Sequence, residues 1–365
     1  IMISFFAKWQ KIDWLLFFAV SILLVLSISI LYSLSLNTDT NNFLVFRKQI
    51  FFALSGIVLF FFFASVNYNV WLTYAKLIFI LFALILVAVL IFGSEVKGTT
   101  GWINFGFFNV QPVEFAKIAL IITLARYFSN YAGEFFMFSH IIKSGLLTLL
   151  FVGLVMLQPD LGSALVLLGT WIIVLLFTGI KKAHFWWLSG AFLVTVVISW
   201  FFILIPYQQD RILTFIDPGR DPQGTGYNVI QSMVAVGSGQ VFGRGLALGS
   251  QSSLRFLPEP GTDFIFAVIA EDLGLVGVTL VLALFVFIFY RLFLVMRKSQ
   301  DDFGAYLILG IAAMLLVQTF INIGMNMGIS PVTGIPLPLV SAGGSSMWAI
   351  MIVLGISQNV YIRNG

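Results

Sequence analysis

Residues 14–34 read WLLFFAVSILLVLSISILYSL, a run that contains no charged side chain. A helix needs about 20 mostly apolar residues to cross the hydrocarbon core of a bilayer. A membrane β-strand would instead alternate apolar and polar residues over about ten positions, and this run does not. The run therefore predicts a transmembrane helix.

Similar apolar runs recur along the whole chain, separated by Gly, Pro, Asn and charged residues. They lie at 14–34, 48–66, 75–93, 113–129, 140–157, 162–180, 185–205, 264–290, 303–327 and 339–361. We predict an all-α polytopic membrane protein with about ten transmembrane helices, forming a single integral membrane domain over residues 1–365. The segment 206–262, between the seventh and eighth helices, is predicted to be a large extracytoplasmic loop.

The composition excludes several other classes of protein. Hydrophobic residues make up 60% of the 365 residues and charged residues only 9%, whereas soluble domains carry about 25% charged residues. A soluble domain, a disordered chain and a nucleic-acid binder with a basic face are thereby excluded. The chain has no cysteine, so disulfides and thiolate metal sites are excluded as well. Its two histidines are too few for a histidine-based metal centre.

The basic residues predict how the helices are oriented. With the N-terminus in the cytoplasm, the inner side receives Lys8, Lys11, Lys76, Arg126, Lys143, Lys181, Lys182, Arg291, Arg297, Lys298 and Arg363. The short loops of the outer side receive only Arg47, Lys48, Lys97 and Lys117. Because cytoplasmic loops are enriched in Lys and Arg, we expect both termini to be cytoplasmic.

The acidic residues gather on the side predicted to be outer. Glu114, Asp160 and Asp263 each lie where a loop meets an apolar run. A charge inside the bilayer costs at least about 2.5–3.5 kcal/mol, so such residues usually have a partner or a function. A further acidic pair, Glu271–Asp272, is assigned to the inner side, within or below the eighth helix.

The segment 98–117, GTTGWINFGFFNVQPVEFAK, leads into the fourth helix. Its proline suits the first turn of a helix, which places Glu114 and Lys117 three residues apart on one helix face. The pair fits an interfacial ion pair with Trp102 as an aromatic anchor. It equally fits a lysine that contacts an anionic headgroup and is held by the glutamate.

Two other outer acids have similar alternatives. Asp160, in Gln158-Pro159-Asp160, fits a turn or a helix N-cap, or a functional carboxylate. Asp263, after Pro258, Pro260 and Gly261, fits a helix cap or a carboxylate base at the membrane boundary.

Two further outer segments differ from ordinary loops. Residues 226–242 are predicted to form an amphipathic helix on the membrane. Residues 328–346, GISPVTGIPLPLVSAGGSS, cannot form a lipid-exposed helix, so they must pack within protein or line a cavity. Their backbone N–H groups and the hydroxyls of Ser345 and Ser346 fit phosphate oxygens, although a simple re-entrant plug fits equally well.

Taken together, the motifs resemble the SEDS family (shape, elongation, division and sporulation) over nearly the whole chain. The matching stretches are WINFGFFNVQPVEFAK, QPDLGSALVLL, DRILTFIDP, FLPEPGTDFIFAVIAEDLG and FINIGMNMGISPVTGIPLPLVSAGGSS. The PVTGIPLP wording is closer to the elongation branch than to the division branch. The chain departs from the usual family pattern at Gly101, Gly261 and Ala342, where arginine, histidine and tyrosine are common.

The resemblance implies a peptidoglycan glycosyltransferase of the bacterial cytoplasmic membrane. Such an enzyme polymerises lipid II at the outer face during cell elongation, beside a class B penicillin-binding protein and the elongation machinery, with no nucleic-acid partner. The residues that match functional positions of the family are Trp102, Glu114, Lys117, Asp160, Arg211 and the essential Asp263. Asp263 is expected to be a general base or a ligand of Mg²⁺ or Mn²⁺, and no organic cofactor is expected. The alternatives are a flippase for a lipid-linked precursor and a non-catalytic scaffold of the wall-synthesis complex.

Overall fold

Long helices account for most of the chain. The structure, a computed structural model, describes residues 11–36, 43–96, 98–106, 108–131, 138–202, 204–221, 224–254 and 256–364. Within this part of the chain ten long helices lie close to the ten predicted spans. They are α2 (Trp14–Leu36), α3 (Leu44–Ser65), α4 (Asn69–Phe92), α5 (Pro112–Asn130), α6 (Phe138–Met156), α7 (Leu161–Phe177), α8 (Lys182–Phe202), α12 (Ile265–Lys298), α13 (Asp302–Asn326) and α14 (Gly344–Asn364).

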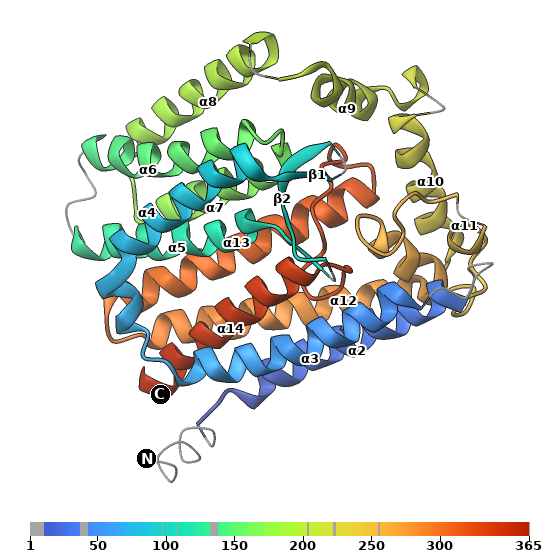
Figure 1. The fold of residues 1–365 in the computed structure, drawn as a ribbon, viewed down its shortest axis with the longest axis horizontal. Coiled ribbons are helices and arrows are strands. Elements are labelled where there is room, and N and C mark those ends of the chain that lie inside the picture. The colour runs from blue at the N-terminus through green and yellow to red at the C-terminus, as the bar shows by residue number, and fades with distance from the viewer. Residues whose placement is uncertain are drawn as a thin grey trace.

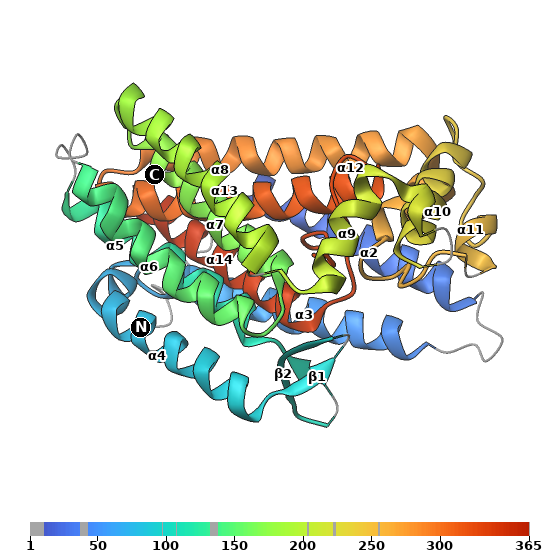
Figure 2. The same cartoon turned by 90° about the horizontal axis from the view of Figure 1, so that it is seen from above.

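The lengths and compositions of these helices confirm a multi-pass membrane protein. Eight of them are long and apolar enough to cross a membrane. Of the other two, α7 is a shorter apolar helix, and α5 spans 19 residues but carries Glu114, Lys117 and Arg126. Side by side, the helices form the bundle seen in Figure 1 and, from above, in Figure 2.

The irregular segments gather at one end of the bundle, which we call the loop end (Figure 1). A small antiparallel sheet lies there, formed by β1 (Ser94–Val96), β2 (Thr99–Asn104) and β3 (Asn109–Val110). The all-α prediction did not include this sheet, which pairs Ser94 with Trp102 and Ile103 with Val110.

The predicted loop 206–262 is largely helical. It contains α9 (Pro206–Ile216), the 3₁₀ turn η1 (Pro218–Arg220), α10 (Thr225–Ser238) and α11 (Ser250–Ser253). The helix predicted near 226–242 is present as α10, but it is not confined to the membrane surface. Val229, Ser232 and Ala235 are buried, and α10 packs against α12 and α13. This part of the segment is therefore a covering layer of the bundle.

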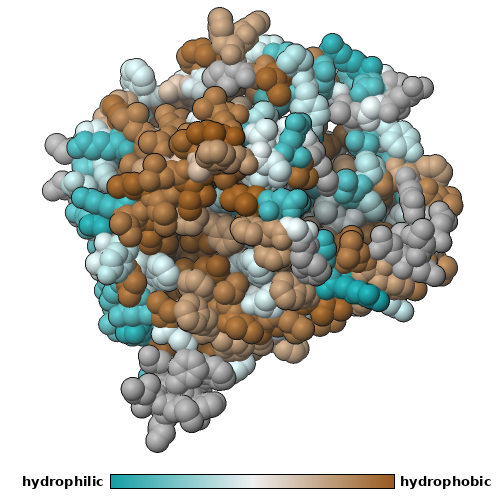
Figure 3. All heavy atoms as spheres, viewed as in Figure 1, coloured by the Kyte–Doolittle hydropathy of each residue, from teal (hydrophilic) through white to brown (hydrophobic). Residues whose placement is uncertain are grey.

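The bundle is held together by apolar packing and by close helix approach. One large cluster contains residues of α2, α3, α12, α13 and α14. A second contains residues of α4, α5, α6 and α7. Small residues let α3 and α14 approach closely: a methyl group added at Gly355 would lie 2.5 Å from the Phe60 carbonyl oxygen. By contrast, α8 has no buried residue, and Figure 1 shows it apart from the other helices. Apolar side chains cover much of the face in Figure 3.

Helix α12 is interrupted near the loop end. Gly274 has φ 65° and ψ −160°, a conformation that only glycine adopts readily. The loop before α12 pairs with the backbone beyond this kink, because Leu275 N–H and Val276 N–H donate to the carbonyls of Gln240 (2.9 Å) and Val241 (3.1 Å). The kink therefore gives the covering loop a backbone edge on which to dock.

The kink also corrects the predicted position of one acidic pair. Glu271 is fully buried and accepts hydrogen bonds from the backbone N–H groups of Gln251 (2.8 Å) and Ser252 (3.0 Å). Asp272 accepts one from Ser33 Oγ at 3.2 Å. Both acids thus lie at the loop end, the same end as Asp263, and the prediction that placed them on the opposite side of the membrane from Asp263 was wrong.

Polar contacts tie helices together at the opposite end. Asp13, at the start of α2, pairs with Arg291 of α12 at 2.7 Å. Tyr68, between α3 and α4, donates its hydroxyl to Asp301 at 2.7 Å. Burial, followed by this hydrogen bond, raises the pKa of Tyr68 to about 12. The hydroxyl therefore remains neutral and keeps donating at ordinary pH.

Candidate active site at the loop end

The first turn of α5 holds a buried ion pair. Pro112 occupies the first position of α5. Glu114 and Lys117 follow three residues apart, so they lie on one face of the helix. Lys117 Nζ lies 2.8 Å from Glu114 Oε1, and the two side chains are only 2% and 4% exposed. Because a buried charge is costly without its partner, the pair favours a structured polar site over a solvated surface contact.

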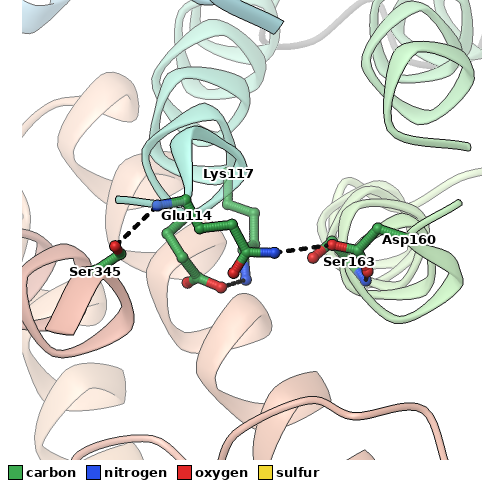
Figure 4. A network of polar contacts seen from close by, with 6 residues as sticks. Glu114, Lys117, Asp160, Ser163 and Ser345 are labelled. Atoms are coloured by element: carbon green, nitrogen blue, oxygen red, sulfur yellow. Dashed lines mark hydrogen bonds and ion pairs between the residues drawn. The ribbon is translucent and has the colours of Figure 1, made fainter. Parts of the chain in front are cut away.

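Gln111, immediately before α5, connects three of the predicted segments. Figure 4 shows Glu114, Asp160 and Ser345, one residue of each segment, close together. Its side-chain Nε2 donates to Asp160 Oδ2 at 3.1 Å, and its backbone N–H donates to Ser345 Oγ at 2.9 Å. Asp160 also caps α7, because its Oδ1 accepts the backbone N–H of Ser163 at 2.9 Å. The cap interpretation of Asp160 is thus confirmed, and its second oxygen reaches the α5 site.

Asp263 lies in the turn that precedes α12. It is not the N-cap residue of α12, because Phe264 occupies that position. Its backbone carbonyl instead accepts hydrogen bonds from Asn322 Nδ2 (3.1 Å) and Asn326 Nδ2 (3.0 Å). A methyl group added at Gly334, whose φ is +76°, would lie 3.5 Å from Asp263 Oδ2. The carboxylate therefore faces the irregular segment between α13 and α14.

Arg211 brings a positive charge to this region from α9. Burial lowers the pKa of its guanidinium, whereas the charges of Asp263 and, less strongly, Asp160 raise it. The side chain also lies over the ring of Tyr207, with 4.3 Å between the guanidinium carbon and the ring centroid, and it bonds to the Tyr207 hydroxyl. Arg211 thus lies within electrostatic reach of two predicted site carboxylates that come from different helices.

The irregular segment between α13 and α14 is packed into protein, as its composition predicted. Ser341 Oγ accepts the Leu337 N–H at 2.8 Å and donates to the Thr262 carbonyl at 2.5 Å. This second bond reaches the residue next to Asp263. The segment therefore forms part of the support around that carboxylate.

Trp102 and Ser346 were also predicted as site residues. Among the hydrogen bonds of the described residues, none joins their side chains to this network. Trp102 Nε1 donates to Thr99 Oγ1 at 3.2 Å, so its bond remains within the β1–β2 hairpin. Ser346 is buried in the first turn of α14. Their assignment to substrate binding remains a prediction.

The three departures from the family pattern lie at contacts of the loop end. A methyl group at Gly101 would lie 2.9 Å from Gln158 Oε1. Gly261 and Ala342 touch each other, because the Ala342 N–H donates to the Gly261 carbonyl at 2.8 Å. The two small residues therefore occupy adjacent positions beside Asp263.

Sequence reasoning missed Asn322 and Asn326. Both are fully buried, and both reach the Asp263 carbonyl. Their spacing of four residues places them on one face of α13. Two amides on one face of an apolar helix were the sequence feature that could have revealed them. Two polar residues in a transmembrane helix usually imply a partner.

The described residues contain no group of three or more His, Cys, Asp or Glu side chains arranged to hold a metal ion. Mg²⁺ is commonly bound by one or two carboxylates together with phosphates of the substrate. The Asp263 carboxylate, which faces the segment between α13 and α14, is the group that would supply the protein ligand of such a set.

Bundle and loop-end site together define a polytopic membrane protein with a buried polar centre at one membrane boundary. The sequence profile of the cell cycle protein family that includes FtsW, RodA and SpoVE matches residues 9–364. This chain therefore belongs to that family, as its motifs predicted.

Particular relatives support the same assignment. Stage V sporulation protein E of Bacillus subtilis (strain 168) is 38% identical over 327 residues, covering 88% of this chain and 87% of that protein. Peptidoglycan glycosyltransferase MrdB of Escherichia coli (strain K12) is 39% identical over 313 residues, covering 84% and 82%. A solved structure on the coordination of polymerization and crosslinking by a peptidoglycan synthase complex aligns with a TM-score of 0.80 and 32% identity, covering 97% of this chain and 98% of that chain.

Proposed function

We propose that this protein is a peptidoglycan glycosyltransferase that polymerises lipid II into glycan strands, with Asp263 as its general base. Membership of a family with relatives named peptidoglycan glycosyltransferase supports the activity. The observation that carries the site assignment is the geometry of the loop end, where Gln111 bonds to both Asp160 and Ser345 and the Asp263 carboxylate faces the segment between α13 and α14.

The reaction joins two sugars with loss of a lipid diphosphate. Asp263 takes the proton of the 4-hydroxyl of one lipid II molecule while that oxygen forms a bond to the anomeric carbon of the other strand. The bond from this carbon to the diphosphate oxygen breaks, and undecaprenyl diphosphate leaves. Direct attack with one carboxylate base inverts the anomeric carbon, by the logic of inverting glycosidases.

The leaving group needs positive charge where negative charge develops. Arg211 and Lys117 supply that charge, and Asp160 and Glu114 orient the two cations. Lys117 is already paired with Glu114, so a diphosphate oxygen would share its remaining N–H donors. Ser345, Ser346 and Trp102 complete the proposed substrate contacts.

A divalent cation fits the same account. Mg²⁺ or Mn²⁺ would be held by Asp263 together with the substrate diphosphate, and it would supply further stabilisation of the leaving-group charge. In that case the Asp263 carboxylate serves as ligand instead of base.

The proposed cellular setting follows from the topology and the relatives. The basic-residue bias supports cytoplasmic termini in the bacterial inner membrane, with the loop end outside. The aligned synthase complex couples polymerization to crosslinking. This supports a class B penicillin-binding protein as partner, within the elongation machinery.

Gel analysis of glycan polymer formed from lipid II by the purified protein, with and without its penicillin-binding partner, tests this function. The proposal predicts that the wild-type protein forms polymer and that the Asp263→Asn variant does not. A precursor flippase would instead move fluorescent lipid II across protein-only liposomes without forming polymer. A non-catalytic scaffold would support growth as Asp263→Ala after removal of the wild-type gene.

A further inference from the structure

Asn326 of α13 reaches the start of α12. Phe264 is the N-cap residue of α12, so the Ala267 N–H belongs to the first turn, where N–H groups have no partner within the helix. The Ala267 N–H donates to Asn326 Oδ1 at 3.1 Å, and Asn326 Nδ2 donates to the Asp263 carbonyl at 3.0 Å. The helical pattern begins one residue later, with Val268 N–H bonding to the Phe264 carbonyl at 3.2 Å. The amide of Asn326 therefore bridges a first-turn N–H of α12 and the carbonyl of Asp263 just before the helix.

A second amide holds the same carbonyl from the same face of α13. Asn322 Nδ2 donates to the Asp263 carbonyl at 3.1 Å and to the Ile335 carbonyl at 2.7 Å. Asn326 Nδ2 also donates to the Asn322 carbonyl at 2.8 Å. The two asparagines thus fasten Asp263 to α13 and to the segment that carries Gly334, beside the carboxylate.

The Asn326 bridge helps to determine where the Asp263 carboxylate lies. If the Ala267 N–H bonded directly to the Asp263 carbonyl instead, Asp263 would become the first residue of the helix pattern and its side chain would turn with the first turn of α12. Both asparagine side chains are fully buried, so the amides are held in place and water does not compete for them.

We propose that Asn322 and Asn326 are positioning residues that keep Asp263 outside α12, with its carboxylate directed at the reacting 4-hydroxyl and towards Arg211. The proposal rests on the function proposed for Asp263. Both asparagine side chains are fully buried and both bond to the Asp263 carbonyl, so each is assigned a role through the Asp263 backbone.

Exchange of amide for carboxylate provides the test. In Asn326→Asp the side chain keeps an acceptor for the Ala267 N–H but loses the donor to Asp263. Because small misplacements of a catalytic group are costly, we expect kcat for polymerisation with the penicillin-binding partner to fall by about tenfold to a hundredfold. The KM for lipid II should stay within about twofold, since the diphosphate contacts are unchanged.

A second variant and a matched control separate positioning from folding. Asn322→Ala leaves the Asn326 bridge intact and should lower kcat less than Asn326→Asp. Thr319→Val is the control, because Thr319 is buried on the same helix and its hydroxyl has no hydrogen-bond partner among the described residues. Its kcat and KM should match the wild type.

Three outcomes would overturn the proposal. The first is that the asparagine variants fold and keep the wild-type kcat while Asp263→Asn is inactive. Asp263 would then have its assigned function, but Asn322 and Asn326 would not position it. The second is failure of both asparagine variants to fold while Thr319→Val folds, because the amides would then serve the fold only. The third is wild-type polymerisation by Asp263→Asn, which would remove the role of Asp263 itself.

Discussion

At the scale of single residues, Glu114 and Lys117 form a pair of buried opposite charges. Glu114 and Lys117 are both almost completely buried, yet their charged atoms lie 2.8 Å apart. Such a pair is not in itself a strong source of stability, since desolvation offsets much of the attraction. Its presence at the membrane boundary is therefore better explained by a need for a fixed cation than by stability.

Removal of one charge tests this interpretation. Glu114→Gln leaves Lys117 buried without its counter-charge, so the free energy of unfolding should fall by about 3–5 kcal/mol. Thermal unfolding in detergent measures the change. The double variant Glu114→Gln with Lys117→Met should recover most of the lost stability but not polymerisation. A Glu114→Gln protein as stable as the wild type would show that the amine does not depend on the glutamate.

At the scale of elements, α12 is both a membrane helix and the support of the covering loop. Its 34 residues would span about 50 Å as one straight helix, whereas the hydrocarbon core is about 30 Å thick. The kink at Gly274 divides it, and the part before the kink carries the two acids that hold the loop. The arrangement keeps Asp263 and the loop in one structural unit.

Substitution of the kink glycine should loosen that unit. In Gly274→Ala a methyl group would lie 2.3 Å from the Gly243 nitrogen and 2.6 Å from the Val241 carbonyl oxygen, on a backbone with φ +65°. We expect a loss of thermal stability and faster hydrogen exchange in residues 239–252. The control is Gly190→Ala in α8, where an added methyl group meets nothing within 4 Å. Equal behaviour of both variants would contradict this role of the kink.

Sequence patterns predicted the helices well and their junctions less well. The run 113–129 corresponds to α5 (Pro112–Asn130), because Gln111-Pro112 is a strong helix start. Glu271–Asp272 was misplaced because the composition of the run 264–290 does not reveal a kink at a single glycine, Gly274. The amides of Asn322 and Asn326 were missed because their partner is a backbone carbonyl 59 and 63 residues away, which spacing within one helix does not reveal.

At the scale of the whole molecule, the account depends on the loop end facing outward. The absence of cysteine from the chain makes single-cysteine labelling possible without background. Arg220→Cys, in an exposed position of η1, should react with a membrane-impermeant maleimide in intact cells. Gln300→Cys, exposed between α12 and α13 at the opposite end, should react only after permeabilisation. The reverse pattern would contradict the predicted orientation.

The central claim is that the Asp263 carboxylate performs the chemistry. Its most direct test is the initial rate of glycan polymer formation from lipid II by the Asp263→Asn variant, purified with its penicillin-binding partner and compared with the wild type. The asparagine has nearly the same shape but can neither accept the hydroxyl proton nor hold a cation as a carboxylate does. The account predicts that the variant folds, binds its partner and forms no detectable polymer. Polymerisation by the folded variant at the wild-type rate would contradict it.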